Sequence, residues 1–195
     1  LSDLETRNIE GYELRTLSEI VKCVTLGRKN KNISDNVKHI SVLHINPDCT
    51  IDFQQVLSYT PISKGRTCLK GDILFSKINP RIPRMTVVPE FDKNLVCSNE
   101  FEIFQPIADI DAYAICFLLK TSYVTKQIEY LTSGTSSSHS RIKREQLMDI
   151  KIPYPVSETT KKELKKINTL IKNSLKKKYI ADAILREQLD KLEQI

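Results

Sequence analysis

The sequence predicts an α+β fold, in which a globular domain of short strands and few helices is followed by a long C-terminal helix with coiled-coil character. Between residues 39 and 106, short runs rich in Val, Ile and Phe alternate with Gly, Pro and Asn turns, as is typical of strands. From residue 158 to 195 there is no Gly or Pro, and most residues favour helix. We therefore expect a globular domain over 1–157 and a helical region over 158–195.

The first half of the domain is expected to open with a helix and to continue as strands. In YELRTLSEIVKCVTLG (12–27) the apolar residues keep a helix-like spacing up to the glycine. Strands are then expected in HISVLHI (39–45), after the turn in NPDCTIDF (46–53), after the Gly-Asp turn in CLKGDILFSKI (68–78), and in MTVVPE (85–90), LVCS (95–98) and EFEIFQP (100–106).

The second half is expected to contain a helix, a polar loop and a closing strand. DAYAICFLLKTSYVTKQIEYL (111–131) predicts one helix, which Asp109 or Asp111 can cap. The Ser- and Thr-rich stretch TSGTSSSHSRIKR (132–144) follows, and REQLMDIKI (144–152) predicts a helical turn and a strand. The expected core includes Ile73, Leu74, Phe75, Phe101, Ile103, Phe104, Phe117 and Leu118.

The C-terminal helix carries an apolar stripe that repeats about every seven residues. A repeat of this kind predicts packing against another helix, although packing against the helix's own domain is the alternative that stays open. Lys178 interrupts the main row, and polar residues in such a seam often fix the register of pairing. The residues expected to make the contact are Leu164, Ile167, Ile171, Leu185, Leu189 and Leu192.

Charge is distributed unevenly along the chain. The net charge is +6 and the pI is about 9.0, which permits a polyanionic partner without requiring one. Residues 1–157 hold 20 basic and 18 acidic side chains, whereas residues 158–195 hold 10 and 6. Because the globular part is nearly balanced, a nucleic-acid surface on it has to be local.

The composition points to the cytoplasm. No apolar run approaches the roughly 18 residues of a membrane span, and no signal-peptide pattern is present. The chain begins at Leu1, which leaves an upstream region open. The five cysteines are scattered and lack any C-x-x-C pair, so we expect buried small side chains in a reducing compartment and no metal site.

Motifs for catalysis are missing from the sequence, so we expect no catalytic residues and no cofactor. There is no G-x-G-x-x-G or Walker pattern and no methyltransferase cofactor loop. Glu163 and Lys165 have a spacing seen in some nucleases, but a solvated charge pair on a helix explains them better. His39 and His44 are expected on opposite faces of a strand, where they cannot share a metal. His139 lies in a serine loop without a nucleophile elbow.

Three segments together resemble the DNA-specificity subunit of type I restriction-modification systems. They are LKGDILFSKINP (69–80), VCSNEFEIFQP (96–106) and SGTSSSHSRIKREQLMDIKIPYP (133–155), in the order and at the spacing of that family, ahead of the heptad helix. VLHINPDCTID (42–52) is a weaker match. The chain is similar to a single target-recognition domain with its spacer helix, whereas the family usually has two of each.

The resemblance implies a recognition subunit without catalysis of its own. Its implied partners are double-stranded DNA, a DNA methyltransferase subunit and, where one exists, a restriction subunit, and a single-domain chain would pair as a homodimer through its helix. Phosphate contacts are expected from Lys29, Lys31, Lys77, Lys143 and Arg144. Base-edge contacts are expected from Asn79, Arg81, Arg84, Ser137, His139 and Arg141.

Two other readings stay open at this point. The chain could be the C-terminal recognition region of a single-chain methyltransferase or restriction-methylation enzyme, which an upstream sequence with catalytic motifs would establish. It could instead be a protein-protein adaptor that uses the helix and never contacts DNA. The family also tends to place a Gln after the Pro-x-Pro motif, and this chain has VSETTKKEL there.

Overall fold

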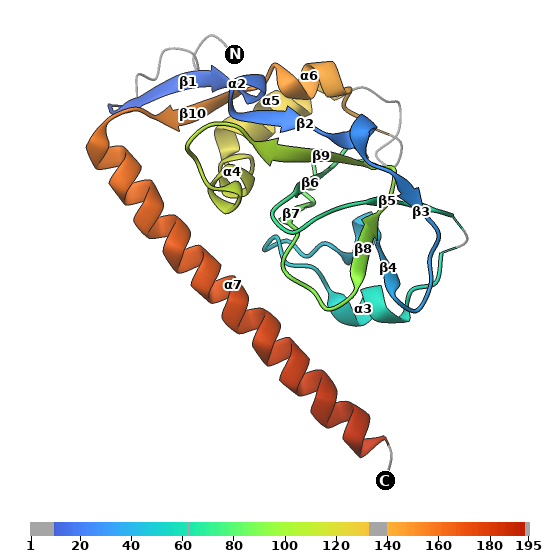
Figure 1. The fold of residues 1–195 in the computed structure, drawn as a ribbon. Coiled ribbons are helices and arrows are strands. Elements are labelled where there is room, and N and C mark those ends of the chain that lie inside the picture. Colours follow the sequence, from blue (N-terminus) through green and yellow to red (C-terminus); the bar gives the residue numbers. More distant parts are fainter. Residues whose placement is uncertain (1–9, 62, 133–139, 194–195) are drawn as a thin grey trace.

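The structure, a computed structural model, describes residues 10–61, 63–132 and 140–193. Within these ranges, a globular domain of small sheets and short helices is followed by one long helix, α7 (Glu158–Leu192), that extends past it (Figure 1). The predicted α+β class with a long C-terminal helix is confirmed. No helix in the described part of the chain is long and apolar enough to cross a lipid bilayer.

An antiparallel sheet of four strands forms the middle layer of the domain. Its strands, in spatial order, are β2 (Val21–Cys23), β9 (Phe101–Pro106), β6 (Ile73–Ser76) and β7 (Met85–Val87). Both faces of β6 and β9 are buried, because alternate side chains point into two different cores. The strands predicted within 68–78, 85–90 and 100–106 are therefore confirmed.

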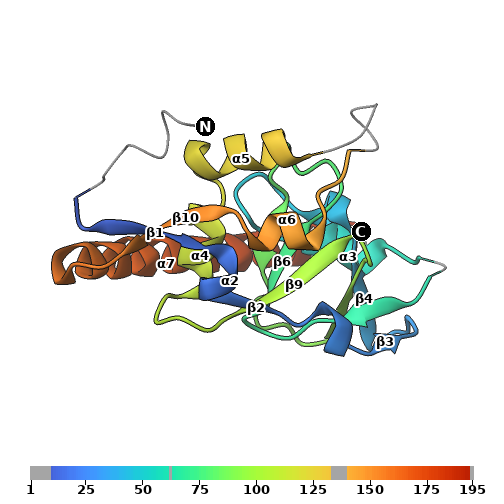
Figure 2. The ribbon, with the colours of Figure 1, turned by 90° about the horizontal axis from the view of Figure 1, so that it is seen from above.

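Short helices cover one face of this middle sheet. They are α2 (Leu17–Ile20), α4 (Ala112–Leu118), α5 (Ser122–Leu131) and α6 (Arg144–Met148). Their apolar residues pack with Phe75 and Phe104 in the larger core. A two-stranded ladder of β1 (Tyr12–Thr16) and β10 (Lys151–Pro155) closes this side of the domain (Figure 2).

A second sheet covers the other face. It contains β3 (Asn30–Lys31), β5 (Gly65–Thr67), β8 (Asn94–Cys97) and β4 (Val37–Ile40), of which β4 and β8 run parallel. Leu74 and Ile103 of the middle sheet pack there with Ile40, Leu95 and neighbouring residues. The helix α3 (Phe53–Ser58) and two short 3-10 turns, η1 (Thr25–Gly27) and η2 (Val42–His44), complete the domain.

The helix predicted over 12–27 is wrong. That segment forms β1, α2, β2 and η1 in succession. Thr16 begins α2 and Glu19 bonds back to the Thr16 backbone, but the helix ends after one turn because Val21 enters the middle sheet opposite Pro106. The apolar residues with helical spacing are buried all the same, since pairing with distant strands decided the backbone conformation.

Two further boundaries differ from the prediction. The strand expected over 39–45 ends at Ile40, because Ser41 caps the 3-10 turn η2 through the backbone N–H of Leu43. The turn at 46–50 leads into a single bridge at Ile51 and then α3, in place of a strand.

The helix expected over 111–131 is divided into α4 and α5. The hydroxyl of Thr121 donates to the carbonyl of Leu118, which ends the first helix. Asp111 caps α4 as one of the two predicted caps. Of the expected core residues, Phe117 and Leu118 are only partly buried, and the other six are buried.

The start of α7 is joined to the first strand through one carbonyl group. The carbonyl of Gly11 accepts hydrogen bonds from the backbone N–H of Val156 and Ser157 and from the hydroxyl of Thr160. Gly11 has a φ of 80°, and a Cβ there would lie 2.6 Å from Cγ2 of Thr160. Only glycine fits this position without strain, so the junction fixes where the helix leaves the domain.

The middle of α7 packs against its own domain. Lys172 pairs with Asp111 at 2.5 Å, and Lys178 pairs with Asp48 at 2.5 Å. The hydroxyl of Tyr179 accepts the backbone N–H of Ile51 at 3.0 Å. Lys178 was expected to lie in an intermolecular seam, and its ammonium group is instead bound by the domain. A groove of about 910 Å³ lies between the domain and the stretch of the helix from Lys172 to Leu189.

Many apolar residues of α7 remain exposed. Leu175 is buried against the domain, whereas other apolar residues of the helix stay largely exposed, and three of these, Ile180, Leu185 and Leu189, border the groove. Of the residues expected to make a dimer contact, Leu164 and Ile171 are partly buried against α4, and the other four are exposed. The exposed apolar residues of α7 are Ile167, Leu170, Ile180, Ile184, Leu185, Leu189 and Leu192.

Candidate nucleic-acid interface

Two basic segments that are about 60 residues apart in the sequence lie side by side. The backbone N–H of Asn79 donates to the carbonyl of Ser140 at 2.9 Å, and that of Ile142 donates to Lys77 at 3.2 Å. The hydroxyl of Ser140 also reaches the amide oxygen of Asn79 at 3.3 Å. The fold therefore joins the predicted DNA-contacting segments 76–84 and 140–144 into one surface.

The segment 76–84 is a tight loop between β6 and β7. Asn79 adopts a left-handed backbone with a φ of 46°, a conformation that asparagine tolerates better than most residues. The backbone N–H of Ile82 donates to the carbonyl of Asn79 at 2.9 Å, and that of Arg84 donates to Ile82 at 2.7 Å. The N–H of Ser76 donates to the carbonyl of Arg84 at 3.0 Å, which closes the base of the loop.

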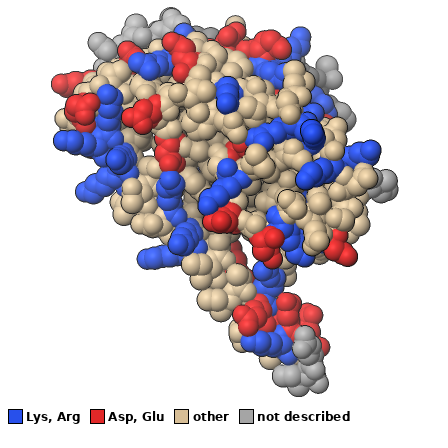
Figure 3. Space-filling model, in the orientation of Figure 1, with Lys and Arg blue, Asp and Glu red and all other residues tan. Residues whose placement is uncertain are grey.

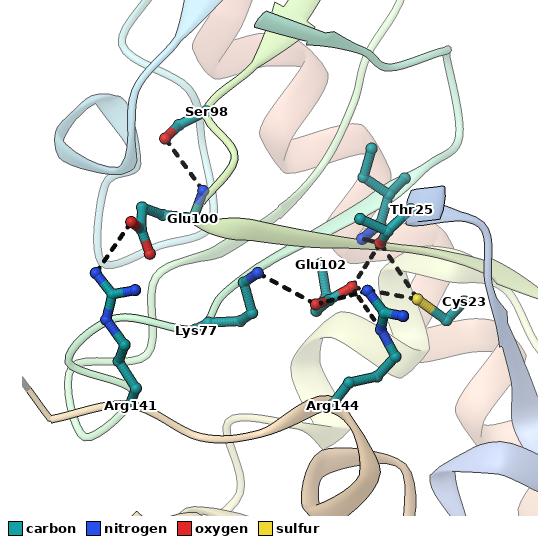
Figure 4. A network of polar contacts seen from close by, with 9 residues as sticks. Cys23, Thr25, Lys77, Ser98, Glu100, Glu102, Arg141 and Arg144 are labelled. Atoms are coloured by element: carbon teal, nitrogen blue, oxygen red, sulfur yellow. Dashed lines mark hydrogen bonds and ion pairs between the residues drawn. The ribbon is translucent and has the colours of Figure 1, made fainter. Parts of the chain in front are cut away.

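A buried carboxylate holds two of the predicted cations. Glu102 of β9 is 1% exposed, and its carboxylate accepts from Nε and Nη2 of Arg144 at 3.1 and 3.2 Å (Figure 4). Lys77 lies 3.3 Å from the same carboxylate. The hydroxyl of Thr25 donates to it at 2.6 Å and the thiol of Cys23 at 3.3 Å. Five side chains from four separate segments thus converge on one site.

The charge of Glu102 is retained despite burial. Burial alone raises the pKa of this carboxyl, but the hydrogen bonds from Thr25 and Arg144 outweigh it, so the pKa lies below its usual value. The bond to Glu102 in turn raises the pKa of Arg144. The site is therefore an ionised cluster at neutral pH, in which Arg144 and Lys77 hold fixed positions at the edge of the two joined loops.

Arg141 belongs to a more open pair. Its guanidinium lies 3.0 Å from Glu100, with 55% of the Arg141 side chain exposed, and the backbone N–H of Glu100 is held by the Ser98 hydroxyl (Figure 4). An exposed pair of this kind is worth little in water. Arg141 can therefore leave Glu100 for a phosphate or a guanine edge at small cost, which the buried cluster does not allow Arg144.

The remaining predicted residues divide into three groups. Arg81, Arg84 and Lys143 belong to the two joined loops, with Arg81 and Lys143 exposed and Arg84 partly buried. Lys29 and Lys31 are exposed at β3, in the second sheet, so the fold does not place them in these loops. Ser137 and His139 lie outside the described residues.

Charged side chains of both signs are mixed over the face of the domain in Figure 3, while lysines gather along the first half of α7. The near balance of charge in the globular part agrees with this picture. A DNA contact by this domain would therefore depend on the local loops more than on a broad basic face.

His39 and His44 do not behave as the sequence predicted. Both are 4% exposed, and both rings contact Tyr59, with centroid distances of 5.7 and 4.9 Å, so the expectation of opposite faces is wrong. The chain leaves the strand after Ile40, and the turn η2 brings the second histidine round to the first. Within the described ranges, no group of three or more His, Cys, Asp or Glu residues could hold a metal.

Reasoning from the sequence missed Glu100 and Glu102. Both lie in EFEIFQP, which was interpreted only as a strand. A carboxylate between Phe101 and Ile103 in an apolar strand is a signal, since buried acids need partners, and it predicts a nearby cation. The sequence does not show which cation binds Glu102, because Lys77 and Arg144 come from distant parts of the chain.

Comparisons with known proteins concern the family and the fold of the chain. A family model described as the type I restriction modification DNA specificity domain matches residues 9–185. The fold is similar to the HsdS subunit from Thermoanaerobacter tengcongensis, with a TM-score of 0.58, 15% identity and coverage of 93% of this chain and 47% of that chain. No curated protein sequence matches.

A second structure, titled as the structural basis underlying complex assembly and conformational transition of the type I R-M system, gives a TM-score of 0.59 at 16% identity. The match covers 92% of this chain and 47% of that one. The chain thus spans about half the length of the structures it resembles. At these identities the likeness concerns the fold.

Proposed function

This chain belongs to the family of type I restriction modification DNA specificity domains, and from that membership we propose that it reads one half of a bipartite DNA target and directs a partner methyltransferase to it. In this proposal the chain performs no chemistry and needs no cofactor or metal. It acts in the cytoplasm, with double-stranded DNA and a modification subunit as partners and a restriction subunit as a further one where the system has it.

One structural observation supports a DNA contact by two loops of the domain. The hydrogen bonds that join segment 76–84 to segment 140–144 gather Asn79, Arg81, Arg84, Arg141 and Lys143 at one surface. These side chains supply what DNA recognition requires, namely bidentate groups for base edges and cations for phosphates. In the proposal Arg141 and Asn79 read bases, while Lys143 contacts the backbone. Lys77 and Arg144, which are paired with Glu102, add positive charge beside this surface and so attract the DNA phosphates.

The exposed stripe of α7 supports pairing with a second copy of the chain. Seven apolar side chains on this helix are about half exposed or more, which is costly unless another surface covers them. Leu175 and Tyr179 of the same helix already contact the chain's own domain. In the proposed homodimer, each helix therefore contacts both its own domain and its partner helix.

Charge along α7 favours an antiparallel pair. Residues 158–178 carry eight lysines and two glutamates, whereas residues 179–193 carry two basic and four acidic side chains. Antiparallel copies place the basic half of one helix beside the acidic half of the other, and parallel copies place like charges together. A closed two-fold pair would present two identical recognition domains, and its target would have symmetric halves separated by an unread spacer.

The proposal is tested by co-expressing the chain with the modification subunit of its type I system and mapping the methylated bases in the host DNA. A symmetric bipartite motif supports the homodimer and the recognition role together. An asymmetric or continuous motif contradicts the homodimer alone.

A matched pair of variants makes the test specific to the interface. Arg141→Ala should change or abolish the mapped motif, whereas Arg186→Ala, far along α7, should leave it intact. Absence of methylation with the cognate subunit present, together with partner binding that is insensitive to salt and to DNA, would favour the adaptor reading.

A further inference from the structure

The loop between β6 and β7 exposes an isoleucine close to two arginines. Ile82 is 53% exposed, and it is flanked by Pro and Arg on both sides in the run Pro80–Arg84. A single exposed apolar residue is ordinary on a protein surface. Here, however, the residue directly follows the turn at Pro80 and Arg81, in a loop whose arginines would attract a polyanion.

The backbone of this loop leaves only the side chain of Ile82 free for a contact. The N–H of Ile82 donates to the carbonyl of Asn79, and its own carbonyl accepts from the N–H of Arg84. Both polar groups of the residue are thus used within the loop. A partner that contacts this part of the loop therefore meets a branched apolar side chain, and the backbone N–H and carbonyl of the same residue are already hydrogen-bonded within the loop.

The same loop is held firmly from below. Pro80 is buried and Pro83 restricts its own φ angle, so two of the five residues in the run have little freedom. The hydroxyl of Ser76 donates to the carbonyl of Ile78 at 2.9 Å, and Asn79 is bonded to Ser140 of the neighbouring segment. An apolar side chain on a loop that is held in this way loses little conformational entropy when it packs against a partner.

We propose that Ile82 is a wedge that enters the DNA between two stacked base pairs and partly separates them. The proposal rests on the proposed function and deepens it, because it identifies a residue that reads the deformability of a base step. Apolar wedges of Phe, Leu, Ile, Met or Pro, inserted from the minor groove, are a known means of kinking DNA. Arg81 and Arg84, which were expected at base edges, contact in this proposal the phosphates on either side of the opened step.

The wedge gives specificity at a position where no base edge is contacted. Steps such as TA or CA open more easily than others, so a target with a flexible step at this point is favoured. Removing the wedge should therefore lower affinity for the target and reduce the preference for a flexible step. Affinity for unrelated DNA, which depends on phosphates, should change little.

The experiment uses the purified full chain and target duplexes selected from a random-sequence library by wild-type binding. 2-Aminopurine is placed at successive positions of one half-site, since its fluorescence rises when it loses its stacking neighbour. The wild type should raise the fluorescence at one step several-fold. Ile82→Ala should abolish that rise and weaken binding about tenfold, equivalent to about 1.4 kcal/mol. Ile82→Met, which keeps an apolar tip, should retain most of both effects.

Ile107→Ala is the matched control. Ile107 is 55% exposed, on a turn after β9, so the variant removes an isoleucine of the same exposure away from the loop. It should bind and unstack DNA as the wild type does. A mismatch at the opened step should tighten binding by the wild type, because separation then costs less, and should leave Ile82→Ala unaffected.

The outcomes separate the wedge from the function on which it rests. If Ile82→Ala matches the wild type in affinity and fluorescence while Arg141→Ala binds poorly, the proposed insertion of Ile82 is refuted. The proposed DNA recognition by the chain is then still supported. If the wild type selects no sequence and binds no duplex, the proposed function fails and the wedge fails with it.

Discussion

Arg144 grips the buried carboxylate of Glu102 with two nitrogens, Nε at 3.1 Å from one oxygen and Nη2 at 3.2 Å from the other. The residues come from α6 and from the central strand β9, so the pair ties the end of segment 140–144 to the middle sheet. Because Lys77 shares the same carboxylate, the positions of two cations depend on one acid.

The first prediction concerns that acid. Glu102→Gln removes the charge that Arg144 and Lys77 share, and we expect the free energy of unfolding to fall by about 2 kcal/mol, less than for a fully buried pair since both cations are partly exposed. Urea denaturation measures it. Glu100→Gln, which breaks the open pair with Arg141, should cost under about 0.5 kcal/mol. Equal losses in the two variants would contradict a special role for Glu102.

The second prediction separates base reading from phosphate contact. Arg141→Ala should cost about 1–3 kcal/mol of binding to the cognate site and relax one target position. Lys143→Ala should weaken binding to all sequences alike and lower the slope of log affinity against log salt by about one. Fluorescence anisotropy titrations on cognate and scrambled duplexes, at several salt concentrations, measure both. Identical behaviour of the two variants would remove the distinction between their roles.

The third prediction concerns the attachment of α7 to its domain. Tyr179→Phe leaves the backbone N–H of Ile51 without its acceptor, so the free energy of unfolding should fall by about 1–2 kcal/mol. Tyr130→Phe removes a hydroxyl from a side chain that is 74% exposed and should change nothing measurable. Urea denaturation again provides the test, and a neutral Tyr179→Phe would mean that the helix is held by its ion pairs and apolar contacts alone.

The fourth prediction tests the proposed homodimer. Leu185→Glu places a charge in the exposed apolar stripe, and sedimentation equilibrium should then show a monomer of about the chain mass, 22.4 kDa, in place of a dimer. Thr169→Glu adds the same charge 16 residues earlier, about 160° around the helix, and should leave the dimer intact. A wild type that is monomeric at high concentration would refute the pairing directly.

The fifth prediction is a pH dependence of stability. Burial, with a smaller effect from His44, lowers the pKa of His39 from its usual 6.5 to about 4. Between these values the unfolded chain binds a proton that the folded chain does not, so stability falls as the pH drops below about 6.5 and levels off below about 4. From pH 7 to 5 the loss from His39 should be about 2 kcal/mol.

Denaturant titrations at the two pH values measure this loss, with His39→Asn as the variant that cannot titrate there. The variant should show a shallower dependence on pH, with the remainder due largely to His44, whose pKa is also lowered by burial. An unchanged pH dependence in His39→Asn would show that another group is responsible.

Much of the fold follows from local sequence. The strands at 73–76, 85–87 and 101–106 were predictable because their short apolar runs agree with their buried environment, and the long helix because residues 158–195 contain no Gly or Pro. The segment 12–27 was not, because its apolar spacing suits a helix and pairing with Pro106 and Pro155 overrides it. The two outcomes differ only in contacts with residues far along the chain, which a local pattern does not contain.

The interface shows the same division. Segments rich in Arg, Lys and Asn were recognisable from composition, but the hydrogen bonds between Asn79 and Ser140 were not, since they join loops about 60 residues apart. The role of Lys178 was misjudged for a related reason. Its place in the heptad suggested a seam between chains, and the loop carrying Asp48, which binds it, is 130 residues away.

The pairing of Tyr12–Thr16 with Lys151–Pro155 has one more consequence. The chain enters and leaves the globular part through adjacent strands, and Gly11 bonds to the first turn of α7 at the same corner. The globular part between these strands is therefore joined to α7 at a single corner. If the proposed function holds, an exchange of the segment between the two strands would replace the DNA-contacting loops and leave the attachment of α7 unchanged.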